Sequence, residues 1–222
     1  MNSRKSQLAL DLRIREATGR SDFLVSGCNE DSVRWIDAWP DWPGSAMVLT
    51  GPAGCGKTHL GMVWKRAAAA VEFGDGIELS DLPDAANILV DDVDRMVDDA
   101  ELFHLYNVVR ATGGTVLFTA RVPPARWEGR LRDLVSRLSA VANVAVQPPD
   151  DVLMGAVVLK MLADQHLEVE PEILRYIVER TERSFEAARA LVSDLNRVSL
   201  AERRAVTIPL VRQVLNIDKD EA

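Results

Sequence analysis

Short apolar runs alternate with helical patterns through the first part of the chain. The runs have the length of buried strands and span residues 46–50, 87–91, 115–119 and 141–146. Apolar residues at helical spacing lie between them, over residues 58–72, 98–110 and 129–138. Strands that alternate with helices are typical of a parallel α/β sheet. A strand at 22–26, a weak strand at 77–79 and a helix over Glu30–Trp39 with Asn29 as its N-cap complete the predicted elements.

The pattern changes after residue 147, where Gln147-Pro148-Pro149-Asp150 interrupts it. Only helical periodicity follows, over residues 150–164, 171–180, 184–200 and 207–216. Pro171 and Pro209 stand where first helical turns would begin. We therefore predict a tail over residues 1–19, an α/β domain over 20–147 and a small helical domain over 148–222.

Composition and charge narrow the class of protein. Of the 222 residues, 47% are hydrophobic and 27% are charged, which argues against a mostly disordered chain. Asp and Glu outnumber Lys and Arg by 34 to 26, a net charge of −8 that disfavours nucleic-acid binding by the whole surface. No apolar run has the length of a membrane helix, and Asp11 interrupts any signal-like core. Since Cys28 and Cys55 make no disulfide framework, we expect a cytoplasmic protein.

The segment Gly51–Thr58 reads Gly-Pro-Ala-Gly-Cys-Gly-Lys-Thr and matches the phosphate-binding loop G-x-x-x-x-G-K-[ST] in full. It follows a predicted strand and opens a predicted helix, so backbone N–H groups and the helix dipole would face a polyphosphate. Lys57 would reach the β- and γ-phosphates, and the Thr58 hydroxyl would bind Mg²⁺. The other loop positions expected to contact a nucleotide are Pro52, Ala53, Gly54, Cys55 and Gly56. We interpret Cys55 as loop filler, with a redox role as the alternative.

Polar residues follow two of the buried strands. Asp91 is expected to hold Mg²⁺ directly or through water, and Asp92 to orient the attacking water. Thr119 ends the next strand, where a polar group can sense the γ-phosphate; the alternative is a simple strand-end turn before Pro123. A solvated acidic face is the reading for Asp98, Asp99 and Glu101, which cap and open the next helix.

Several arginines are candidates for contacts with phosphate groups. Arg137 closes a predicted helix, where it can reach a nucleotide on a second molecule as an arginine finger or simply complement the helix dipole. In the helical domain, Arg183 and Arg189 flank Phe185 and could fold over bound phosphates. Surface pairing of either arginine with Glu186 is an equally good account.

The tail contains the motif Gln7-Leu8-Ala9-Leu10-Asp11-Leu12. In an extended segment Leu8, Leu10 and Leu12 point the same way, with Gln7 one step ahead. An apolar stripe in such a tail suggests docking into a hydrophobic groove. Packing of the tail on its own domain is the alternative.

Five segments together resemble the AAA+ module of the bacterial replication initiator DnaA: residues 23–29, 51–60, 91–92, 136–138 and 204–209. Two departures decide the subfamily. The chain ends at Ala222, which leaves no residues for the initiator's helix-turn-helix domain, and the motif at 7–12 looks like the hexapeptide that binds the DNA polymerase sliding clamp. A module of this kind resembles the Hda family, the regulators that inactivate DnaA after initiation.

The resemblance implies a role for each matching residue. Gln7, Leu8, Leu10 and Leu12 would tether the protein to the β-subunit clamp of DNA polymerase III, although Asp11 stands where many such peptides carry proline. ADP or ATP with Mg²⁺ would be held by the phosphate loop, by Asp91 and by three further residues, Leu24, Val25 and His59. Arg137 would be inserted toward ATP bound to DnaA. The family's lid-domain sensor arginine falls on Arg189 or, with a different alignment, on Glu186, with Arg183 as a third candidate.

Two other functions remain open on the sequence. One is a self-contained AAA+ ATPase of the helicase-loader type, which would use Asp92 and Arg137 within its own dimer or oligomer and act on single-stranded DNA. The other is an adaptor that binds nucleotide only for folding and presents the clamp peptide. The net charge of −8 argues against the first, and neither reading includes sequence-specific DNA binding or a membrane.

Overall fold

The computed structural model describes residues 24–74, 82–95 and 98–216. The tail motif Gln7–Leu12 and the strand expected at 77–79 lie outside the described residues. Among the described helices, none combines the length and the hydropathy that a membrane span requires.

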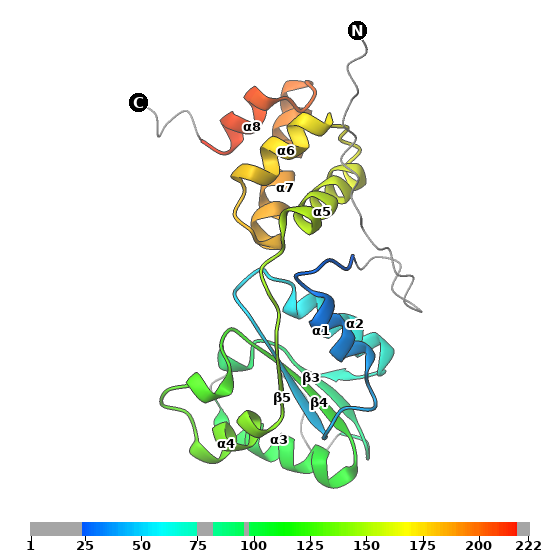
Figure 1. Ribbon diagram of the computed structural model, residues 1–222, viewed down its shortest axis with the longest axis vertical. Coiled ribbons are helices and arrows are strands. Elements are labelled where there is room, and N and C mark those ends of the chain that lie inside the picture. Colours follow the sequence, from blue (N-terminus) through cyan, green and yellow to red (C-terminus); the bar gives the residue numbers. More distant parts are fainter. Residues whose placement is uncertain (1–23, 75–81, 96–97, 217–222) are drawn as a thin grey trace. The chain divides into compact units, whose positions relative to one another are not determined.

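A five-stranded parallel sheet forms the centre of the first part of the protein, with the strand order β2-β3-β4-β1-β5 (Figure 1). Its strands are β1 Ala46–Thr50, β2 Val71–Glu72, β3 Asn87–Val90, β4 Thr115–Ala120 and β5 Ala142–Ala145. All five residues of β1 are buried, as expected for a central parallel strand covered on both faces. The α/β fold class predicted from the sequence is therefore confirmed.

Helices cover both faces of this sheet (Figure 1). They are α1 Glu30–Asp37, α2 Lys57–Ala67, α3 Asp99–Thr112 and α4 Arg132–Ala140, with short 3₁₀ turns η2 at Val93–Arg95 and η3 at Pro124–Arg126. Helix α3 starts where Asp98 accepts hydrogen bonds from the N–H groups of Ala100 and Glu101, and it ends at Gly113 in the left-handed conformation. Both ends were predicted from these residue types.

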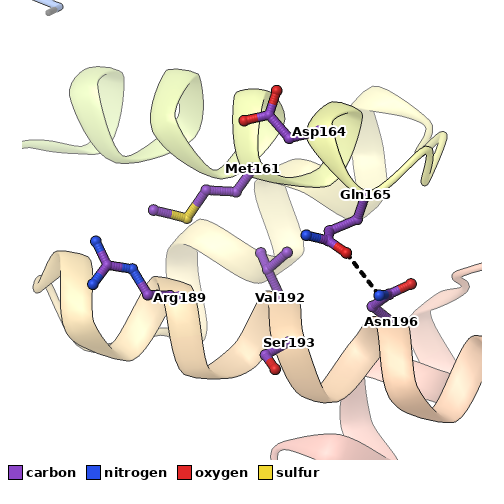
Figure 2. Close-up of a pocket in the computed structure, with 7 residues that line it drawn as sticks. All are labelled: Met161, Asp164, Gln165, Arg189, Val192, Ser193 and Asn196. Atoms are coloured by element: carbon purple, nitrogen blue, oxygen red, sulfur yellow. Dashed lines mark hydrogen bonds between the residues drawn. The ribbon is translucent and has the colours of Figure 1, made fainter. Parts of the chain in front are cut away.

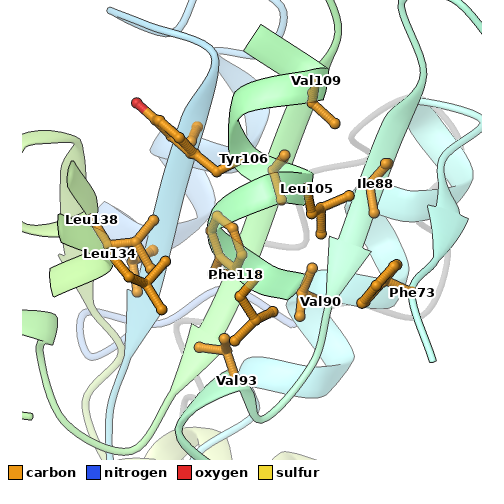
Figure 3. Close-up of a cluster of buried hydrophobic side chains, with 14 of the residues drawn as sticks. Phe73, Ile88, Val90, Val93, Leu105, Tyr106, Val109, Phe118, Leu134 and Leu138 are labelled. Carbon is orange, nitrogen blue, oxygen red and sulfur yellow. The ribbon is translucent and has the colours of Figure 1, made fainter. Parts of the chain in front are cut away.

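Alternate strand residues meet α3 and α4 in one buried cluster, shown in Figure 3. Val90 and Phe118 project from β3 and β4, while Leu134 and Leu138 project from α4, and each of these side chains is fully buried. These buried side chains hold α4 against the sheet, because truncating one of them to alanine lowers the free energy of unfolding by about 2–5 kcal/mol.

The chain divides into two compact units. One contains residues 27–149 together with Arg183–Ala187, and the other contains the rest of the described chain. The second unit is helical, with α5 Asp151–Asp164, α6 Pro171–Arg180, α7 Phe185–Glu202 and α8 Ile208–Val214. Pro171 and Pro209 both lie in the first helical turn, as predicted. Its core is built from fully buried side chains that include Leu162, Ile177, Leu195 and Leu210.

Two local predictions were wrong. Residues 24–26 form no strand. Helix α2 ends at Ala67 rather than near residue 72, because Val71 and Glu72 pair with Ile88 and Leu89 as the edge strand β2. Asn29 is the N-cap residue of α1, as predicted, but its side chain makes no capping hydrogen bond to the helix; the Ser32 hydroxyl donates to the Asn29 carbonyl at 2.9 Å.

Candidate functional site

The phosphate-loop motif forms a tight turn between β1 and α2. Gly54 has φ +69° and Gly56 has φ +103°, a left-handed backbone that residues with a side chain rarely adopt. A Cβ atom added at Gly54 would lie 2.7 Å from the Ser184 Cβ, so space as well as conformation requires glycine there. Gly56 is the N-cap of α2, which directs the first N–H groups of that helix toward the loop.

Lys57 is the first residue of α2 and only 5% exposed. Its ammonium group donates a hydrogen bond to the Pro52 carbonyl at 2.9 Å, so the side chain turns back across the loop. A buried cation at the N-terminus of a helix is suited to an anion such as a polyphosphate.

Thr58 and Asp91 bring two oxygen-bearing groups together beside the loop. The Thr58 hydroxyl donates to Asp91 Oδ2 at 2.9 Å, although most of α2 and the strands β2 and β3 lie between the two residues in the sequence. Hydroxyl and carboxylate oxygens are the ligands that Mg²⁺ prefers, and in its usual sites they leave most positions to phosphate and water. The donor set at these two residues therefore fits Mg²⁺.

Thr119 links the ends of β3 and β4. Its fully buried hydroxyl donates to Asp91 Oδ1 at 2.6 Å and accepts the Asp92 N–H at 2.8 Å. Asp92 has φ +49°, a conformation that is strained for aspartate, and the bond to Thr119 holds it. Thr119 is thus the polar group that was predicted to lie next to the acidic residues after β3, and it contacts both of them at hydrogen-bond distance.

The Asp92 carboxylate lies 3.6 Å from the guanidinium of Arg95, with the two side chains 39% and 65% exposed. An ion pair this exposed contributes about 0–1 kcal/mol. The carboxylate is therefore accessible to water, which is the property that a water-orienting group requires.

Cys55 is buried inside the loop. Burial raises the pKa of its thiol above the usual value, although the Lys57 charge acts in the opposite direction. A thiol with a raised pKa is a poor nucleophile, which favours the reading of Cys55 as a structural loop residue.

The segment Arg183–Ala187 belongs to the same compact unit as the phosphate loop. The Phe185 N–H donates to the Gly54 carbonyl at 2.8 Å, and the Phe185 ring packs against Gly56. Ser184 is buried and its hydroxyl accepts the Ala187 N–H, which caps the first turn of α7. Sequence reasoning noted the arginines around Phe185 but missed the contacts of Ser184 and Phe185, because these join residues far apart in the chain.

Arg137 lies on α4 and is half-buried. Its guanidinium sits over the ring of Phe103 from α3, with the carbon 5.1 Å from the ring centroid. Within the described part of the chain, it makes no ion pair and donates no hydrogen bond. Its N–H groups therefore remain available for an external anion, and the side chain is not locked into the core.

Arg189 lines a pocket of about 300 Å³ between α5 and α7, shown in Figure 2. Met161 and Val192 form the apolar part of this pocket, and Asn196 donates a hydrogen bond to Gln165 across it at 2.8 Å. The roles expected for Arg189, and for Leu24, Val25 and His59, in nucleotide binding stay predictions.

Comparison with known proteins identifies the helical part and the fold. Residues 156–215 match the family model described as Hda, lid domain. Domain III of the initiator DnaA from Thermotoga maritima superposes with a TM-score of 0.73 at 19% identity, covering 87% of this chain and 93% of that one. Residues 156–215 therefore form an Hda-type lid domain, and the chain has the fold of DnaA domain III. The resemblance stated from the sequence is thereby confirmed.

Other solved structures share this fold. AMPPCP-bound DnaA from Aquifex aeolicus matches with a TM-score of 0.64 at 19% identity over 81% of this chain, which spans 65% of the length of that protein. The AAA domain of FIGL-1 in complex with ADP matches with a TM-score of 0.67 at 16% identity, over 90% of this chain and 84% of that one. At these identities the matches establish the fold.

Proposed function

We propose that this protein binds ADP or ATP with Mg²⁺, docks on the DNA polymerase sliding clamp and promotes hydrolysis of the ATP bound to DnaA. The effect would be to prevent a second initiation of chromosome replication. The observation that carries the proposal is the combination of an intact phosphate loop with an Arg137 guanidinium that is left without an ionic partner in the described chain.

The nucleotide would be held by groups of this chain. Backbone N–H groups of residues 53–56 would donate hydrogen bonds to the phosphates and the ammonium of Lys57 would offset their charge, with Gly54 and Gly56 allowing the close approach. Thr58 and Asp91 would hold Mg²⁺, which when bound neutralises phosphate charge. Thr119 fixes the Asp91 carboxylate and the Asp92 backbone, so their positions do not depend on the nucleotide alone.

Arg137 would act on the partner rather than on this chain's own nucleotide. A guanidinium inserted beside a γ-phosphate stabilises the charge that spreads over its oxygens in the transition state. In well-studied P-loop enzymes such an arginine raises the rate by roughly 10³–10⁵. The cation–π contact with Phe103 leaves the N–H groups free for this purpose while orienting the side chain.

The tail motif supplies the proposed anchor to the clamp. In an extended peptide Leu8, Leu10 and Leu12 would form an apolar stripe behind the polar Gln7, which would suit a hydrophobic groove. A tethered protein meets its partner at a raised effective concentration, so docking on the clamp would concentrate the protein near DNA under replication.

Steady-state hydrolysis of ATP by DnaA tests this proposal. We expect the protein to accelerate hydrolysis when clamp loaded on DNA is present, and the Gln7→Ala/Leu8→Ala variant to lose the clamp dependence. A Ser3→Ala/Lys5→Ala variant is the matched tail control and should behave as the wild type. Unchanged hydrolysis by DnaA in all these mixtures would refute the proposal.

The exposed carboxylate of Asp92 beside Asp91 supports a second function, hydrolysis at the protein's own site in a homo-oligomer acting on single-stranded DNA. The same assay without DnaA separates the two. ATPase activity of the protein alone that rises strongly with single-stranded DNA, and without clamp, would favour this second function.

A further inference from the structure

Arg130 lies in the loop before α4 and has one of the more buried ion pairs among the described residues. Its Nε donates to Asp99 Oδ1, and the two side chains are 15% and 18% exposed. Its guanidinium also stacks on Trp127, 5.0 Å from the ring centroid. This ion pair is largely removed from water, and both residues make further contacts. Removing one of the two residues would therefore leave the other charge buried and unpaired, which destabilises the folded state.

The same guanidinium reaches the turn that follows the acid strand. Its Nη1 and Nη2 donate to the carbonyls of Asp94 at 3.3 Å and Val93 at 3.5 Å, in η2 immediately after Asp92. Arg130 therefore joins the segment that follows Asp91 and Asp92 to the first turn of α3.

Asp99 completes the connection to α4. Its second oxygen accepts the N–H of Leu131 at 2.6 Å. Leu131 occupies the N-cap position of α4 but offers no side-chain capping bond. The start of α4 is therefore held by the Asp99 carboxylate of α3 and not by a capping side chain of α4 itself.

Helix α3 contacts α4 a second time one turn further on, where Phe103 lies beneath the Arg137 guanidinium. Asp99 and Phe103 are four residues apart, so they lie on the same face of α3. One face of α3 therefore holds both the start of α4 and the arginine that α4 carries.

We propose that Arg130 is a positioning residue, which fixes the orientation of α4 and so the place at which Arg137 is presented to the partner's nucleotide. This inference rests on the proposed function. A reacting group displaced by about 1 Å loses on the order of 100-fold in rate, so the loss of these contacts should act on the catalysed step rather than on docking.

The variant Arg130→Lys tests the assignment because it keeps the charge but cannot reach Asp99 and two carbonyls with one planar group. We expect the maximal acceleration of ATP hydrolysis by DnaA to fall about tenfold or more. The concentration for half-maximal effect and the affinity of the protein's own site for ADP should stay within about twofold of wild type, the margin within which sites without shared contacts act independently. Arg110→Lys, at the exposed end of α3, is the matched control.

A double-mutant cycle and an exchange measurement keep the test decisive. In an Arg137→Ala background, Arg130→Lys should cause no further loss, because both changes remove the same group from the partner's site. Amide hydrogen exchange should rise in α4 and stay unchanged in α2. Three results would overturn the inference. They are additive losses of acceleration in the double mutant, wild-type acceleration by Arg130→Lys, and a loss of ADP affinity as large as the loss of acceleration.

Failure of the proposed function gives a different result. If the wild-type protein does not accelerate hydrolysis, the proposed function and the role of Arg137 both fall. The exchange measurement then still decides whether Arg130 holds α4 in place, and unchanged exchange in α4 would overturn that claim as well.

Discussion

At the scale of single residues, the motif predicted the residue types of the site but not all of their contacts. Lys57, Thr58 and Asp91 follow from the loop pattern and from an acid that closes a buried strand. For Thr119 the sequence allows either a sensing role or a plain turn, because the residues next to its side chain depend on the pairing of β3 with β4. In the fold its hydroxyl bridges Asp91 and the Asp92 backbone.

Replacing Lys57 with alanine should weaken ADP binding. The ammonium is the buried cation of the loop, and hydrogen bonds to charged groups contribute about 1.5–3 kcal/mol, equivalent to roughly 10- to 150-fold in affinity. Titration calorimetry measures the change. Lys65→Ala is the control, since Lys65 pairs with Glu72 at the edge strand; equal affinities of wild type and Lys57→Ala would contradict the assignment of the loop.

The Thr119→Val substitution should destabilise the protein by about 1–3 kcal/mol. Valine keeps the shape of the fully buried Thr119 side chain but leaves the Asp92 N–H without its partner and removes the shorter of the two hydrogen bonds to Asp91 Oδ1. Urea unfolding with and without ADP and Mg²⁺ tests this, and the variant should also gain less stability from the ligand than the wild type. Wild-type stability in both conditions would show that the bridge has no role.

The Cys55 thiol should react slowly with alkylating reagents near neutral pH and faster as the pH rises. Burial raises the pKa of Cys55, so the neutral form is favoured in the folded state. Its contribution to stability is therefore present below the pKa of the unfolded chain and is lost as the pH rises through the folded value. Alkylation of a Cys28→Ser variant across this range measures it, against a Cys55→Ser variant; rapid neutral modification at Cys55 would contradict the burial.

At the scale of elements, hydrophobic periodicity located the central strands and most helices because each buries a regular face. The pattern could not locate the edge strand β2, which is two residues long and only half-buried. Nor could it show that the first residues of α7 contact the phosphate loop, because Phe185 and Gly54 are brought together only by the folded chain. Some helix boundaries differ from the predicted ones by a few residues; α4 begins at Arg132 rather than at Gly129.

The Leu138→Ala substitution should destabilise the protein by about 2–5 kcal/mol, because it empties a fully buried position on α4. Ser139→Ala, at an exposed position next to it, should change stability little. Chemical denaturation compares the two variants with the wild type. Equal midpoints for Leu138→Ala and the wild type would mean that α4 is not anchored by the cluster in Figure 3.

At the scale of the whole molecule, the sequence predicted an α/β sheet followed by helices, and the fold contains both. The two compact units are not separated by a single boundary in the sequence, because Arg183–Ala187 belongs to the unit that contains the sheet. Residues 156–215 are identified as an Hda-type lid by the family model, and the likeness to DnaA domain III establishes the fold. The central claim beyond this is that Arg137 acts on a nucleotide held by a second protein.

A single-turnover experiment tests that claim most directly. DnaA loaded with labelled ATP is mixed with DNA-bound clamp and an excess of this protein holding unlabelled ADP, so that only the partner's nucleotide is followed. We predict rapid hydrolysis with the wild type and with Arg110→Ala, and a rate close to that of DnaA alone with Arg137→Ala. Hydrolysis by Arg137→Ala at the wild-type rate would contradict the account.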